Sequence, residues 1–229
     1  MDIVKIILED LNRKEGKYQG EKYYSYVPEN IRGYKDIVDH ENNVVTIENS
    51  NNTLYTNYFK MLVDQKIDYL FAKEPVFYNP LFTTPKLVEL LEDVTFLASL
   101  DGKAWLHLYT KENELKYITI KDSQIIPFYY EDNKTLKMVI RYYMLDKDSK
   151  KIQVEIWTLE GVNTIQIEKE KIVNQSFESH YIEKELFNDA VVDTKQKNFG
   201  FIPFIELRNN RTSDSHLVNI QSLLDCYTD

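Results

Sequence analysis

The spacing of apolar residues changes along the chain, from a helical period in the N-terminal part to a strand period in the middle. A helix over residues 2–14, capped by Asp2, is predicted from the helical spacing of Ile3, Ile6, Ile7 and Leu11. A longer helix is predicted over about 54–72, where helical spacing continues until Pro75 ends it. The same spacing returns over about 86–99. Three helices are therefore expected in the first hundred residues, with an irregular stretch over 21–50 between the first two.

The helix predicted over 54–72 has an unusually wide apolar surface, which covers more than half of its circumference. Such a surface is typical of a helix that neighbours contact on most sides. Asn51, Asn52 or Thr53 is expected to cap its N-terminus. We expect Asp64 on the solvent side, and a buried face that consists of Leu54, Tyr58, Leu62 and Tyr69.

Beyond Gly102 the period changes from 3.6 to 2. Apolar and polar residues alternate through 136–144 and 152–157, and turn-forming residues separate the runs. This pattern predicts five strands over about 103–169, arranged as an antiparallel meander with one face buried. Residues 170–200 are polar and give no clear period. A last strand is predicted over 201–207, with Pro203 placing it at an edge or at a strand start.

The predicted elements define an α+β fold, in which the antiparallel meander packs with helices at about 54–72, 86–99 and 214–228. Ser213 or Asp214 is expected to cap the final helix. Residues 1–50 are predicted to form an N-terminal helix and an irregular, tyrosine-rich arm. Residues 51–229 are predicted to form one α+β domain. The final helix carries no stop signal, so the chain is expected to be cut there.

Composition narrows the classes of function. The 229 residues carry a formal net charge of −9, which argues against a surface that wraps nucleic acid. The single cysteine, Cys226, permits no internal disulfide and fits the reducing interior of a cell. No apolar stretch is long enough to span a membrane, so a soluble intracellular protein is expected. The 17 tyrosines and 11 phenylalanines are typical of packed sheets or of extensive protein–protein contact.

The sequence lacks the usual motifs of enzyme sites. The four histidines, His40, His107, His180 and His216, are too widely spaced to form a helical metal-binding pair. Glycine-rich phosphate loops and the G-x-S-x-G elbow are absent. The segment 213–216 holds serine, aspartate and histidine, but as sequence neighbours they suit a helix cap better than a catalytic triad. Cys226 is expected to act as a small hydrophobe on its helix. We therefore predict no catalytic, metal-binding or cofactor-binding residues and no cofactor, and we assign no binding residues.

Three segments carry a recognisable set of motifs. Residues 52–75 contain an asparagine-led entry, Val-Asp-Gln-Lys, Tyr-Leu and a Lys-x-Pro exit. Residues 102–109 begin with Gly-Lys-Ala-Trp, and residues 199–210 contain Gly-Phe-Ile-Pro and end with Asn-Asn, ahead of Leu223-Leu224-Asp225. In this order and at this spacing, the three segments resemble the portal proteins of tailed bacteriophages, the siphovirus-type head-to-tail connector family.

The resemblance implies a structural, non-enzymatic role. Portal proteins form a dodecameric ring at one vertex of the phage head, with a channel for DNA packaging and ejection. The partners implied are other copies of the chain, terminase, capsid or scaffold proteins and head–tail connector proteins, with no membrane contact. Residues 51–229 would then be the wing part of the subunit, cut before the stem, clip and crown. This part should bind DNA little, and the protein should be found in the virion and, during assembly, in the host cytoplasm.

Two other functions remain open at this point. One is an α+β hydrolase or nuclease with an acidic site, which would cleave DNA with a divalent metal ion. The other is a generic protein-interaction module, which differs from a portal wing only in its partners.

Overall fold

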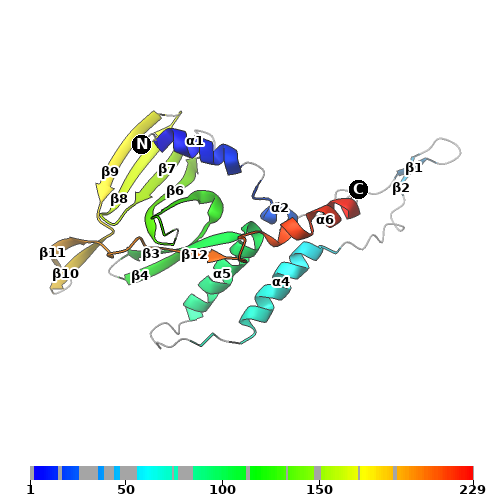
Figure 1. Ribbon diagram of the computed structural model, residues 1–229, viewed down its shortest axis with the longest axis horizontal. Coiled ribbons are helices and arrows are strands. Elements are labelled where there is room, and N and C mark those ends of the chain that lie inside the picture. The colour runs from blue at the N-terminus through cyan, green and yellow to red at the C-terminus, as the bar shows by residue number, and fades with distance from the viewer. Residues whose placement is uncertain are drawn as a thin grey trace.

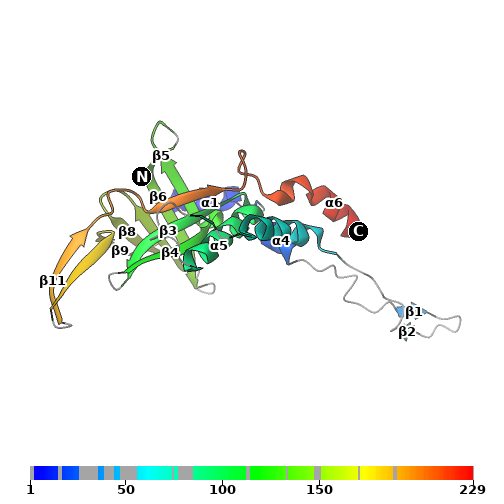
Figure 2. The same cartoon turned by 90° about the horizontal axis from the view of Figure 1, so that it is seen from below.

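A computed structural model describes most of the chain and has the expected α+β architecture, which two perpendicular views show (Figure 1 and Figure 2). The described residues are 3–14, 17–25, 36–38, 44–46, 56–73, 75–76, 85–111, 114–132, 134–146, 151–169, 171–187 and 190–228. The described helices, including two single 3-10 turns, are α1 (Ile3–Lys14), α2 (Gly20–Tyr24), α4 (Tyr58–Phe71), α5 (Pro85–Asp101), η2 (Asp122–Gln124), η3 (His216–Asn219) and α6 (Gln221–Thr228).

The main β structure is divided between two antiparallel sheets. The larger one follows sequence order through β5 (Ile125–Tyr129), β6 (Leu136–Asp146), β7 (Lys151–Trp157), β8 (Val162–Glu168) and β9 (Lys171–Glu178). The smaller one has the order β12 (Phe204–Arg208), β3 (Lys103–Lys111) and β4 (Glu114–Lys121). Two-stranded ribbons are formed by β1 (Asp36–Val38) with β2 (Val44–Thr46) and by β10 (Tyr181–Phe187) with β11 (Ala190–Lys197).

The prediction of one meander over 103–169 is therefore wrong in its connectivity. The η2 turn redirects the chain after β4, so β3 and β4 leave the meander and pair with each other, and β3 also pairs with β12. The 170–200 segment, which gave no clear period, forms β9, β10 and β11. The position of β12 agrees with the prediction, because it is an edge strand that begins directly after Pro203.

The predicted helix at 86–99 is confirmed by α5, whereas the helices predicted at 54–72 and 214–228 differ in their starts. Asn57 caps α4, since its side-chain oxygen accepts a hydrogen bond from the Lys60 backbone nitrogen at 2.9 Å. The caps expected at 51–53 lie outside the described residues. The C-terminal helix is preceded by η3, which Ser215 caps instead of Ser213 or Asp214, by accepting from the Leu217 backbone nitrogen at 3.0 Å.

Helix α1 lies across one face of the five-stranded sheet (Figure 1). Its Ile7 is 1% exposed and packs with side chains of β5 to β8, among them Ile140 and Ile165. The residues that form this contact are those whose helical spacing predicted the helix, with Val4 added and Leu11 left partly exposed. Whether the chain divides at residue 50 stays a prediction.

A buried polar network fixes α1 to the junction between the two sheets. Lys14 Nζ lies 2.6 Å from Asp10 Oδ2 and donates to the Ile125 carbonyl at 2.8 Å. The Tyr142 hydroxyl donates to the same Asp10 oxygen at 2.8 Å. Asp122 accepts from the Trp105 indole nitrogen at 2.8 Å and, on its other oxygen, from the Tyr18 hydroxyl at 2.7 Å. Burial lowers the pKa of Lys14, and the Asp10 carboxylate opposes that change.

Gly102 joins α5 to β3 in a conformation that other residues rarely adopt. Its φ is +88°, and its backbone nitrogen donates to the Ala98 carbonyl at 2.7 Å to close the helix. A Cβ at this position would lie 2.2 Å from the Ser213 carbonyl oxygen. The segment after β12 thus packs directly on the backbone of Gly102, and the Asn209 backbone nitrogen donates to the Gly102 carbonyl at 2.9 Å.

We expect Gly102→Ala to lower the unfolding free energy by about 3 kcal/mol or more, because it adds backbone strain and a clash with Ser213. Gly200→Ala is the matched control. Its φ is +77°, but nothing lies within 4 Å of the added Cβ, so the cost should be about 1 kcal/mol. Urea unfolding of both variants measures the difference, and equal losses would contradict the close packing at Gly102.

Candidate interaction surface

The three described histidines lie in separate environments. His107 is buried between the sheets, stacks on Phe204 at 4.2 Å between ring centroids and donates from Nδ1 to the Pro203 carbonyl at 2.9 Å. Burial lowers its pKa to about 4. His180 contacts the Thr158 carbonyl, and His216 lies in η3, while His40 is outside the described residues. Within the described ranges, no three histidine, cysteine, aspartate or glutamate residues are grouped as a metal site.

The segment 209–216 acts as a structural clasp. The side-chain amides of Asn209 and Asn210 both donate to the Asp214 carbonyl, at 2.7 and 2.9 Å. Lys66 of α4 donates to Asn209 Oδ1 and to the Ser99 hydroxyl of α5. These contacts connect both helices to the segment. The paired asparagines therefore hold the backbone of the 209–216 segment in a closed loop. The side chain of Cys226 lies outside the described set.

Asp101 is the described carboxyl group with the largest shift in pKa. It is 9% exposed at the C-terminus of α5, and burial, followed by the nearby Glu21 carboxylate, raises its pKa to about 7. Shifts of this kind occur at catalytic sites and in structural clusters alike. Here the neighbouring charges are Glu21, Lys121, Asp122 and Lys17, and the first two form an ion pair at 2.5 Å.

Within the part of the chain that the structure describes, one side of α4 is packed and the other is exposed. Phe59 and Val63 are fully buried against Leu100 and Leu217, while Asp64 accepts a hydrogen bond from the Tyr24 hydroxyl at 2.6 Å. The expectation that Asp64 faces solvent, away from a buried face with Tyr58, Leu62 and Tyr69, is therefore wrong. Leu54, the fourth residue of that predicted face, lies outside the described residues. The apolar arc is wide enough to contain two stripes, and spacing alone does not tell which one the chain itself covers.

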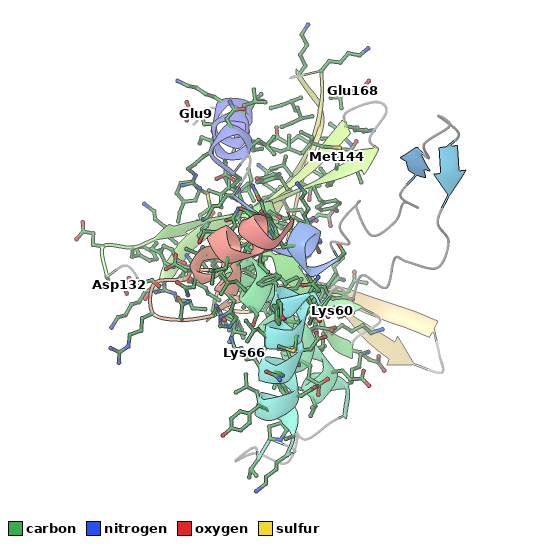
Figure 3. The ribbon with its side chains drawn as sticks, turned by 90° about the vertical axis from the view of Figure 1, so that its right-hand side faces the viewer. Glu9, Lys60, Lys66, Asp132, Met144 and Glu168 are labelled. Carbon is green, nitrogen blue, oxygen red and sulfur yellow. The ribbon has the colours of Figure 1, made fainter. Side chains whose placement is uncertain are left out.

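The exposed stripe of α4 is the candidate interaction surface, and we call it the α4 face. It consists of Tyr58, Met61, Leu62 and Tyr69, which are 51%, 41%, 43% and 84% exposed. These residues lie on one side of the helix by their spacing of three, four, seven and eleven residues. Figure 3 shows α4 on the outside of the molecule, with Lys60 and Lys66 marking its course. Side chains of this size are normally covered when they gather on one surface.

An acidic groove runs beside the α4 face, between α4 and α5. It has a volume of about 360 Å³ and is lined by Asp64, Ile67, Asp68, Glu92, Asp93 and Phe96. Asp68 and Asp93 are exposed. The surface as a whole is thus apolar along the helix and negatively charged along one flank, which suits contact with an apolar surface that carries positive charge.

The structure has the features of a structural subunit. The motif residues Gly102, Asn209 and Asn210 hold the fold together, and the largest exposed feature of α4 is suited to contact with another chain. That combination is typical of a structural subunit that works by assembly.

Comparison with known proteins names the family. The family model for the phage portal protein, SPP1 Gp6-like, matches residues 97–229, and the chain belongs to that family. A portal protein of Clostridium phage phiCD119 is 28% identical over 249 residues, which cover 97% of this chain and 52% of that relative. The chain thus spans about half the length of the curated relative that it matches. The family is structural and belongs to the phage head. In the described part of the chain, no helix is both long and apolar enough to cross a bilayer.

Substitutions at two adjacent residues, Val63 and Leu62, distinguish the packed side of α4 from its exposed side. Val63→Asp should cost about 4 kcal/mol or more in unfolding free energy, because it places an unpaired charge in the core. Leu62→Asp, on the exposed stripe, should cost under about 1 kcal/mol. Thermal and urea unfolding measure both, and a comparable loss for Leu62→Asp would show that the chain itself covers the α4 face.

The Asp101 carboxyl predicts a pH dependence of stability. Its folded pKa lies above the unfolded value, so its contribution is fully present at low pH and is lost as pH rises through about 7. Asp101→Asn mimics the protonated acid. We expect this variant to gain more than about 1 kcal/mol relative to the original chain at pH 8.5, and less at pH 5. Asp93→Asn, an exposed site on the same helix, should change stability little at either pH. An equal effect of Asp101→Asn at both values would contradict the assignment.

Proposed function

We propose that this chain is the wing part of a portal subunit whose full-length form assembles as a dodecameric ring at one vertex of the phage head. The ring would provide the channel through which DNA is packaged and later ejected. Its further partners would be terminase, capsid or scaffold proteins and the head–tail connector. During assembly the protein would be in the host cytoplasm. Family membership supports the proposal, and the observation in the structure that carries it is the uncovered α4 face.

The charge of the chain is compatible with this role. A net charge of −9 gives no general attraction to the phosphate backbone, so DNA would pass the ring without being held by this part. No observation favours the hydrolase or nuclease, and the family assignment favours the portal over a generic interaction module.

The test uses the full-length protein. Native mass spectrometry and negative-stain microscopy should find a closed ring of twelve subunits, and incubation with duplex DNA and Mg²⁺ should leave the DNA intact. A full-length protein that stays monomeric at micromolar concentration, or metal-dependent cleavage that depends on carboxylates of this chain, would contradict the proposal.

A further inference from the structure

We propose that the α4 face of one subunit binds the outer edge of the five-stranded sheet, strand β9, of a second copy of this chain. The contact would be head to tail, with two different surfaces meeting. The inference rests on the proposed function, because it names which surfaces of the wing meet in the ring.

Strand β9 presents an exposed apolar surface that could receive the α4 face. It is the last strand of its sheet, and all eight of its residues are exposed. Ile172, Val173 and Phe177 are 50%, 53% and 63% exposed. An edge strand with such side chains readily pairs with or packs on another chain unless something covers it. We call Ile172, Val173 and Phe177, together with Lys169 and Lys171, the β9 patch.

The charges beside the two surfaces are of opposite sign. Asp68 and Asp93 are exposed beside the α4 face, and Lys169 and Lys171 are exposed at the start of the β9 patch. A contact between the α4 face and the β9 patch can place these carboxylates against these lysines, whereas an antiparallel contact between two β9 strands would place Lys171 against Glu178. Opposite charges across an interface favour association, so the acidic flank of the α4 face and the start of the β9 patch are matched in charge.

The two surfaces also lie on opposite sides of the molecule. In Figure 1, β9 is at the upper left and α4 at the lower right. Seen from a perpendicular direction, Glu168, which pairs with Lys171 of β9, lies at the top, and Lys60 and Lys66 of α4 lie below (Figure 3). A repeated contact between unlike surfaces on opposite sides generates a ring when the rotation closes. Neither surface could form such a ring by pairing with itself.

Crosslinking of the full-length protein tests which surfaces meet. In a Cys226→Ser background, a chain carrying both Leu62→Cys and Val173→Cys should give a ladder of multimers with a short bismaleimide, because each subunit links to a neighbour on both sides. Each single-cysteine variant should give monomers only. A dimer from Leu62→Cys alone would indicate a symmetric contact between α4 faces and would overturn the inference.

Charge reversal tests the pairing independently. Lys169→Glu with Lys171→Glu should weaken ring formation by about tenfold or more, and adding Asp68→Lys with Asp93→Lys should restore much of it. Lys5→Glu with Lys22→Glu, at exposed positions of α1 and α2, serves as the control and should leave the ring intact. Circular dichroism of each variant checks that it is folded.

The outcomes separate this inference from the proposed function. Rings that form normally in the reversed variants, without the crosslinked ladder, would overturn the α4–β9 contact and leave the portal function standing. The same holds if the α4 face crosslinks only to a different protein of the phage. A full-length protein that forms no ring would overturn both.

Discussion

The buried contact between Lys14, Asp10 and the backbone around Asp122 is the interaction on which the arrangement of the two sheets depends. Lys14 Nζ reaches three carbonyls, of Asp122, Ser123 and Ile125, at the point where the chain leaves one sheet for the other. Placing an ammonium group there is costly unless carboxylate and carbonyl oxygens replace its water. Asp10 provides the opposite charge, and Tyr142 and Arg13 complete the hydrogen bonds of that carboxylate. The first helix, the η2 turn and both sheets are therefore held in one relative orientation.

The close packing at Gly102 fixes the helices relative to the smaller sheet in a similar way. The clasp formed by Asn209 and Asn210 can pack on Gly102 only because no side chain stands between them. Lys66 then extends the connection from the clasp to α4. The motif residues Gly102, Asn209 and Asn210 are thus residues that fix neighbouring elements relative to one another. A protein whose work is mechanical needs that property, whereas a catalytic set would converge on a reacting atom instead.

Periodicity was sufficient to predict the elements whose burial is decided within the chain. Ile7 on α1, Val94 on α5, and Ile165 and Ile167 of β8 are each buried on one side of their own element, so their spacing is regular. The split of the sheet could not be predicted, because it depends on three residues of η2 and on a polar network between segments more than a hundred residues apart. Strand β9 was missed since it is exposed along its whole length and therefore has no alternation. The strained glycine was recognisable as a turn, but its close contact with Ser213 was not.

The burial of α4 in the structure differs from the burial that its wide apolar arc predicted. A helix with apolar residues around more than half of its circumference is expected to be surrounded, yet the described chain covers only the side with Phe59 and Val63. Nothing in the described part of the chain covers the α4 face, and burying it against another chain would contribute roughly 25 cal/mol for each Å² of apolar area. The packed side of the same helix is bonded to α2 through Asp64 and to the clasp through Lys66. In the proposed ring, a neighbouring subunit on α4 would therefore act on the contacts that hold α4 to the segment packed on Gly102. If a second subunit binds this helix, the orientation of that subunit and the positions of α2 and the clasp depend on each other.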